Sequence, residues 1–183
     1  MKTPKYIGLL ILTLLTIVCV WSVLRKDEPS CDISSFIVDE NTLLSGGYSE
    51  MGPIWHTGED KLGSEKTCRI FVEQDGYTAH HTIYEYRNTY VAQLHFVLEK
   101  EVFFPSGWQW GKLGESEAWN ADAWRIQCGE SSDPYLGDRC AAVLRYGKYI
   151  SHLSSSIAKN FRSPQDFLDI VREFDTKFIS CDY

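Results

Sequence analysis

The sequence lacks the short motifs that mark the common classes of enzyme. It contains no HExxH or related metal-binding spacing and no GxSxG, and Gly46-Gly47 lacks the pattern of a glycine-rich phosphate loop. No CxxC pair and no Cys/His spacing typical of structural zinc occurs. These absences predict no cofactor, no resident metal and no nucleotide, and they favour a non-catalytic role over an enzyme.

Positive charge is also scarce in most of the chain. Residues 31–183 contain 14 Lys or Arg and 23 Asp or Glu, which gives this part a net charge of −9. A nucleic-acid partner requires a basic surface, so the composition argues against one. The acidity also argues against a domain that lies flat on an anionic membrane. The ordinary interpretation of the excess is solubility.

Charge is absent from residues 6–24, which read YIGLLILTLLTIVCVWSVL. Nineteen helical residues span about 28 Å, close to one hydrocarbon core. A cleavable signal peptide normally has a shorter apolar core, and the nearest small-x-small site, at Val20 to Ser22, is poor. Cys19 and Cys31 both lack the residues that precede a lipoprotein cysteine. The run therefore predicts an uncleaved, single-pass signal anchor.

Lys2 and Lys5 precede the run, and the positive-inside rule gives a slight bias towards a cytoplasmic N-terminus. We therefore expect a cytoplasmic tail at residues 1–5, the anchor at 6–24, a linker at 25–31 and one extracytoplasmic domain at 32–183. The predicted location is the cytoplasmic membrane, with the C-terminal domain on its outer side.

Five cysteines follow the anchor, and an oxidising compartment makes disulfides their natural use. Cys128 and Cys140 bracket a loop rich in Gly, Ser, Asp and Pro between two strand-like runs, and we predict that they pair. Such a bridge stabilises a fold by roughly 3 kcal/mol. Cys31, Cys68 and Cys181 compete for a second bridge, as Cys31–Cys181 or Cys31–Cys68, and the spacing does not choose between them.

The hydrophobic pattern predicts an α+β domain. Alternating runs indicate strands near residues 68–74, 77–88, 123–128, 140–147 and 148–158, with turns at Asp75-Gly76 and at Gly147. Helices are expected near residues 32–44, from residue 88 or 89 to about 104, and from 164 to 179, while 45–66 and 106–119 read as loops. The helix after residue 88 carries an apolar stripe of Val91, Leu94, Leu98 and Val102. The expected domain is a sheet of about five antiparallel strands, packed by an internal helix and a C-terminal helix.

Three residues are candidates for a metal site. His81 and Glu85 share one face of a strand, and His95 on the next helix would supply a third ligand for a metal-assisted hydrolase. The neighbouring His80 points to the opposite face. The stronger interpretation is that these side chains are polar members of a half-exposed strand. The serines at 151–156 beside His152 likewise read as a polar strand face.

Aromatic side chains gather between residues 103 and 124. Trp108, Trp110 and Trp119 lie mostly outside predicted strands and could form a platform for sugars, lipid headgroups or a protein partner. The alternative is that they cover the sheet as part of the core. Trp124, inside a predicted strand, reads as core.

Several stretches carry a resemblance to known proteins: CRIFVEQ, HHTIYEY, ADAWRIQC, CAAVLRYGKYISHL and SPQDFLDIVREFDTKF. They resemble a group of bacterial exported or membrane-anchored small domains that combine a cysteine pair bridging a loop, an aromatic strand and a terminal helix bearing an aspartate, here Asp175. The element order is similar to the PsbP-like α/β sandwich, which serves as an extrinsic subunit of photosynthetic membranes. The resemblance implies an α+β fold beside a membrane and no catalytic residues.

The leading prediction is a membrane-tethered, non-catalytic binding or accessory domain on the outer face of the bacterial cytoplasmic membrane. It could serve as a small subunit of a larger membrane complex. The competing predictions are the hydrolase that uses His81, Glu85 and His95, and the sugar- or headgroup-binding module that uses the tryptophans.

Overall fold

The computed structural model describes residues 4–27, 32–43, 54–57, 63–74, 76–104, 113–115, 117–130, 137–158 and 161–178. These residues form one antiparallel sheet, which confirms the α+β class. Its six strands are arranged in the order β1-β2-β3-β6-β5-β4. Their bounds are Ile54–Thr57 (β1), Lys66–Gln74 (β2), Tyr77–Glu85 (β3), Ala123–Glu130 (β4), Asp138–Tyr146 (β5) and Tyr149–Ser156 (β6). Strand β1, which pairs with β2, falls in a segment expected to be loop.

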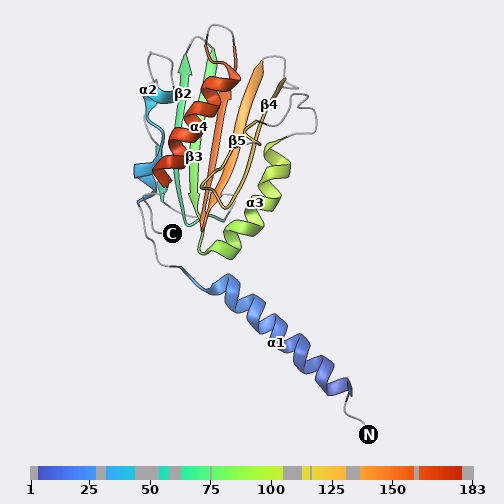
Figure 1. Ribbon diagram of the computed structural model, residues 1–183. Helices are drawn as coiled ribbons and strands as arrows, with labels where there is room; N and C mark the ends of the chain where they lie inside the picture. Colours follow the sequence, from blue (N-terminus) through green and yellow to red (C-terminus); the bar gives the residue numbers. More distant parts are fainter. Residues whose placement is uncertain are drawn as a thin grey trace.

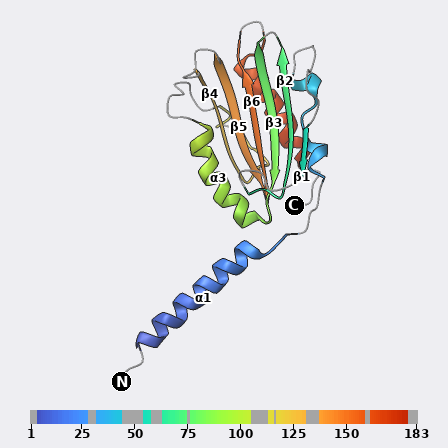
Figure 2. The ribbon, with the colours of Figure 1, turned by 180° about the vertical axis from the view of Figure 1, so that it is seen from behind.

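Helices lie on both faces of the sheet (Figures 1 and 2). Helix α4, Pro164–Phe178, covers one face together with the short 3₁₀ helix η1, Ile33–Phe36, and α2, Glu40–Leu43. Helix α3, Thr89–Phe103, packs on part of the other face, against β5 and β6. We call these the α4 face and the α3 face. The short helix expected over residues 32–44 is thus two separate turns, whereas the α3 and α4 regions are helical as predicted.

The main core lies between the α4 face and α4 itself. Phe167, Val171, Phe174 and Phe178 are fully buried along one side of the helix, at the three- and four-residue spacing that the sequence showed. Ser163 fixes the start of the helix, because Asp166 N–H donates to its hydroxyl at 3.2 Å and Asp166 Oδ2 accepts from the Ser163 N–H at 2.8 Å. The buried side chains supply the hydrophobic free energy that fixes the fold.

Both predicted strand turns are confirmed. Gly76, between β2 and β3, has φ +80°, and Gly147, between β5 and β6, has φ +53°. This left-handed conformation favours glycine. The turn at Gly147 brings β5 and β6 into register, with Tyr146 opposite Tyr149.

Helix α1, Pro4–Leu24, lies outside the domain (Figure 1). Most of its described side chains are apolar and exposed, and the described residues of the domain meet α1 at the end of the helix. There Asn88 Nδ2 donates to the Ser22 carbonyl at 2.8 Å, and Asp27 Oδ2 accepts from the Thr89 N–H at 3.1 Å. Among the described residues, no helix has the combined length and hydropathy needed to cross a membrane. The transmembrane assignment therefore stays a prediction.

The predicted disulfide between Cys128 and Cys140 is confirmed. The two residues face each other on β4 and β5, with their Cα atoms 4.0 Å apart. Cys68 on β2 is a free, fully buried thiol, so it does not pair with Cys31. Cys31 and Cys181 lie outside the described residues, and a bridge between them stays a prediction.

We expect the Cys68 thiol of the folded protein to resist maleimide at pH 7 and to react after denaturation. Burial, with a smaller contribution from Asp32, raises its pKa to about 12, so the reactive thiolate is scarce. Peptide mapping under non-reducing conditions should recover Cys128 joined to Cys140. Rapid native labelling of Cys68, or free thiols at 128 and 140, would contradict this arrangement.

Candidate functional site

The residues proposed for a metal site are not brought together. His81 lies on the α4 face, is fully buried and packs edge-on against Phe174, with ring centroids 4.6 Å apart. Its Nδ1 accepts from the Val38 N–H at 3.1 Å, so Nε2 carries the proton and donates to Ser151 Oγ at 2.9 Å. Both ring nitrogens are therefore engaged within the core.

Glu85 and His95 are also engaged elsewhere. The Glu85 carboxylate is buried and pairs with Lys148 at 2.9 Å and with Lys66 at 3.3 Å. His95 belongs to α3, on the opposite side of the sheet from His81, and stacks on Tyr86 at 4.6 Å. In the part of the chain that the structure describes, no group of three or more His, Cys, Asp or Glu is placed to hold a metal ion. The hydrolase hypothesis is therefore wrong about these three residues acting as one site.

Of the three tryptophans predicted to form a platform, Trp119 lies within the described residues. Trp119 is half-buried, packs on the edge of the core and donates from Nε1 to the Gly114 carbonyl at 3.1 Å. Its ring lies 6.0 Å from that of Trp124, which is also packed against the core. Trp108 and Trp110 lie outside the described residues, so their role stays a prediction.

A group of cationic and polar side chains occupies the α3 face instead. Successive residues of a strand alternate between faces, so every second residue of β2, β3, β5 and β6 points to this side. Register places His80 of β3 opposite Ser154 of β6, and Arg139 of β5 opposite Ser156 of β6. Arg69 of β2 lies opposite Thr82 of β3. We call Arg69, His80, Arg139 and His152 the cationic cluster, after its two arginines.

Arg139 is the central member of this cluster. Its guanidinium donates from Nη1 to Thr78 Oγ1 at 3.1 Å and from Nη2 to Ser154 Oγ at 3.3 Å, so it reaches across β6. Among the described residues, none of its partners is a carboxylate. Burial lowers the pKa of the guanidinium. Gly129, directly opposite Arg139 on β4, adds no side chain above it.

The neighbouring side chains add positive potential and hydroxyl donors. Arg69 Nε donates to Thr82 Oγ1 at 3.1 Å, on the side of β3 away from Arg139. Burial, together with Arg139, His152 and Arg69, lowers the pKa of His80 to about 4. His80 is therefore neutral at pH 7, and a charged imidazole there would be repelled by both arginines.

The arrangement has the chemistry of an anion-binding site. A guanidinium that is partly withdrawn from water, and whose described partners are hydroxyl groups, can still donate charge-assisted hydrogen bonds to an anion. A carboxylate or phosphate oxygen placed beside Arg139 would gain a charge-assisted hydrogen bond from it, and serine and threonine hydroxyls lie within the same cluster.

The sequence contained part of this signal. His80 and Thr82, like His152 and Ser154, lie two residues apart in a strand and could be assigned to polar strand faces. The contact of Arg139 with Thr78 and Ser154 could not be predicted. It depends on the register of β5 against β6 and on β3 being the other neighbour of β6.

Comparisons with known proteins give little further information. No protein-family model matches the sequence, and no curated protein matches it significantly, so the resemblance noted from its motifs gains no support. Among solved structures, the extracellular domain of PknH from Mycobacterium tuberculosis is similar, with a TM-score of 0.49 and 8% sequence identity. The match covers 81% of this chain and 98% of that chain. This likeness is too distant to bear on ligand or location.

Proposed function

We propose that the chain is a membrane-tethered, non-catalytic binding domain on the outer side of the cytoplasmic membrane, which takes a small anionic ligand on its cationic cluster. The observation that carries the proposal is Arg139, a partly buried guanidinium that meets hydroxyl groups and no described carboxylate. Carboxylate and phosphate are the ligand classes that fit it. The two arginines of the cluster lie on the α3 face of a domain that is acidic overall.

The anchor is supported by the surface of α1. Twelve large apolar side chains along it are between 40% and 66% exposed. Its hydroxyl groups are satisfied within the helix: Thr13 and Thr16 donate to carbonyls three and four residues earlier, and Ser22 donates to the Val18 carbonyl. Internal satisfaction of polar groups is the condition that a lipid environment imposes.

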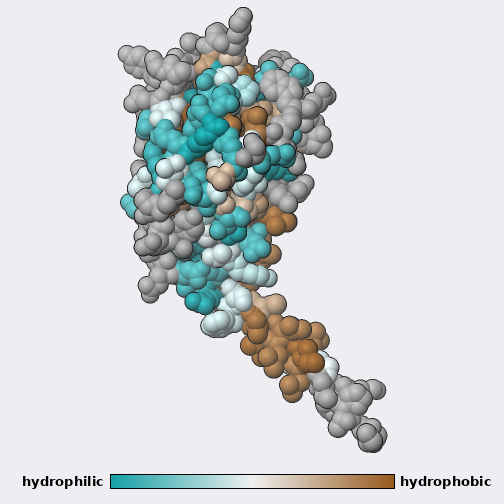
Figure 3. All heavy atoms as spheres, viewed as in Figure 1, coloured by the Kyte–Doolittle hydropathy of each residue, from teal (hydrophilic) through white to brown (hydrophobic). Residues whose placement is uncertain are grey.

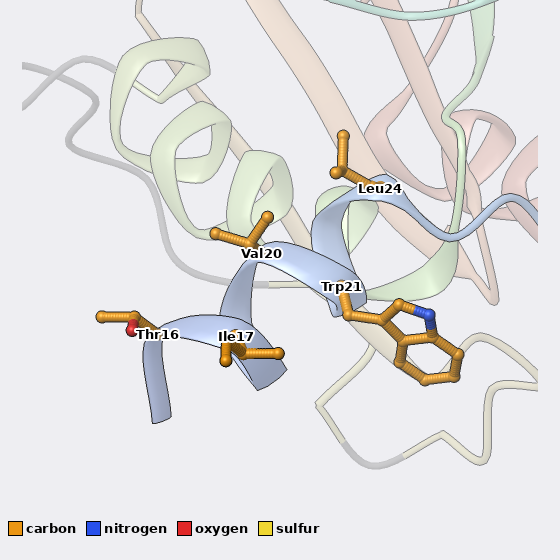
Figure 4. A pocket seen from close by; sticks show the side chains of 5 residues that line it. All are labelled: Thr16, Ile17, Val20, Trp21 and Leu24. Carbon is orange, nitrogen blue, oxygen red and sulfur yellow. The ribbon is translucent and has the colours of Figure 1, made fainter. Parts of the chain in front are cut away.

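A shallow apolar depression on α1 adds to this argument. It has a volume of about 320 Å³ and is lined by Thr16, Ile17, Val20, Trp21 and Leu24 (Figure 4). Such a surface is costly in water, whereas acyl chains fill it without loss. An outer location is supported separately by the disulfide between Cys128 and Cys140, since such bonds persist mainly in oxidising compartments. Membership of a larger complex stays a prediction.

Titration calorimetry on the full chain in zwitterionic nanodiscs tests the ligand class. Inorganic phosphate and malonate are the probes, at pH 7 and low ionic strength. We expect saturable binding of at least one of them, weakened about tenfold or more in Arg139→Gln, because that variant loses the charge-assisted contacts.

Arg172→Gln is the matched control. Arg172 lies on α4, away from the α3 face, and already pairs with Glu117, so its loss should leave anion affinity unchanged. Equal weakening in both variants, or no saturable binding of either probe at tens of millimolar, would contradict the proposal.

A further inference from the structure

Helix α3 exposes apolar side chains on the side that faces away from the sheet. Tyr90 is 42% exposed, Leu94 48%, Val97 50% and Leu98 64%. Their spacing places them on one side of the helix, while Ala92 and Phe96 pack on the sheet from the other. We call the four exposed residues the α3 stripe. Leu94 and Leu98 belong to the apolar pattern seen in the sequence, which an amphipathic helix normally turns towards the core.

The start of α3 is fixed to the end of α1. Asn88 caps α3, because its Oδ1 accepts from the Val91 N–H at 2.9 Å, and its Nδ2 donates to carbonyls at the end of α1, including Ser22 at 2.8 Å. Asp27 adds a second tie through the Thr89 N–H, and the Lys148 ammonium donates to the Asp27 carbonyl at 3.2 Å. The two helices therefore meet at a hydrogen-bonded junction.

The direction of α3 suits a position along a membrane surface. From this junction α3 runs across the line of α1 instead of continuing it, in both ribbon views (Figures 1 and 2). Hydrophobic side chains beside the domain continue towards the hydrophobic surface of α1 (Figure 3). If α1 crosses the bilayer, the beginning of α3 lies at the level where the hydrocarbon meets the headgroups.

We propose that α3 is an interfacial helix, whose stripe of Tyr90, Leu94, Val97 and Leu98 lies in the outer headgroup–acyl boundary of the membrane that holds α1. The inference rests on the proposed anchor. The lipid occupant follows from continuity with α1 and from the composition of the stripe: three aliphatic residues and one tyrosine, the residue that favours this boundary. The cations Arg25, Lys26 and Arg87 are also exposed at the junction, where they pair with the carboxylates of Asp27 and Glu65.

The consequence is a fixed orientation of the domain. One transmembrane helix alone leaves the outer domain free to tilt and rotate. A second membrane contact along α3 would hold the α3 face at a set angle to the bilayer, and with it the cationic cluster.

Depth-dependent quenching tests this inference in the full chain. A polarity-sensitive NBD label is placed at Leu98→Cys, in a background with Cys19→Ser, Cys31→Ser and Cys181→Ser. The chain is reconstituted in phosphatidylcholine nanodiscs with or without spin-labelled acyl chains. The matched control carries the label at Asp169→Cys on α4, where the native side chain is 60% exposed. We expect blue-shifted emission at 98 and several-fold stronger quenching by the labelled lipid at 98 than at 169.

The other outcomes overturn the inference in distinguishable ways. Water-like emission at both positions, with the chain still held in the nanodisc, would refute the interfacial helix and leave the anchor standing. Blue-shifted emission at 98 without lipid quenching would assign the stripe to a protein partner or a second copy. A chain that does not stay in the nanodisc at all would refute both the anchor and the inference.

Discussion

Asp175→Ala should lower the free energy of unfolding by about 3–5 kcal/mol. The Asp175 carboxylate is buried and accepts four hydrogen bonds: from Asn120 N at 2.9 Å, Asn120 Nδ2 at 2.7 Å, Ala121 N at 3.1 Å and Tyr146 OH at 2.7 Å. Hydrogen bonds to a charged group contribute about 1.5–3 kcal/mol each, and removal of the acceptor leaves buried donors unsatisfied. The measurement is urea unfolding followed by circular dichroism.

Glu173→Ala is the matched control, because Glu173 lies two residues earlier on α4, is exposed and pairs with Lys177 in an i,i+4 surface ion pair. We expect a change within about 0.5 kcal/mol there. If the two variants lose equal stability, the Asp175 network does not hold the segment before β4 to α4 as described. Asp175→Asn should fall between them, since an amide keeps one acceptor and loses the charge.

Lowering the pH from 7 to 5 should reduce the free energy of unfolding by about 4 kcal/mol, because the fold keeps two histidines neutral. Burial, with smaller contributions from His80, His152 and Lys177, lowers the pKa of His81 to about 3, and the pKa of His80 is lowered to about 4. In the unfolded chain the two histidines have an ordinary pKa of about 6.5 and are protonated in this pH range. In the folded chain they stay neutral. Stability therefore falls as the pH drops, by about 1.4 kcal/mol per pH unit for each histidine.

The loss should begin near pH 6.5, where the unfolded histidines begin to protonate. Most carboxylates titrate at lower pH, so the window above pH 5 isolates the histidines. His81→Gln should flatten the dependence by about half in this window, whatever its stability at pH 7, because glutamine does not titrate. An unchanged slope in His81→Gln would show that His81 is not the neutral, buried imidazole described.

Much of the fold could be predicted from local pattern. The turn at Gly147, the capped start of α4 and its phenylalanine-rich face are encoded within a few residues and form as expected. Strand β1 could not be predicted, because its four residues have a glycine-rich context and gain their conformation by pairing with β2. The same limit applies to α3: its periodicity was visible, but which side packs on the sheet depends on tertiary structure.

The candidate site shows the limit of local pattern for function. The sequence directed attention to His81 and Glu85. The ring nitrogens of His81 are engaged in the core, and the Glu85 carboxylate is paired with two lysines. Arg139 attracted no attention, because a single arginine in a strand has no signature of its own. Its significance comes from Thr78 and Ser154, which lie far away along the chain and are brought close only by the pairing of three strands.

The most direct test of the central claim, an anionic ligand on the α3 face, is the pKa of His80 measured by NMR in the full chain with and without saturating phosphate. Without phosphate we expect a value of about 4, set by burial and by Arg139, His152 and Arg69. A bound anion would offset the positive charge around the ring, so the pKa should rise on binding. The same titration is repeated with malonate, and a His80 pKa that neither anion changes would contradict the claim.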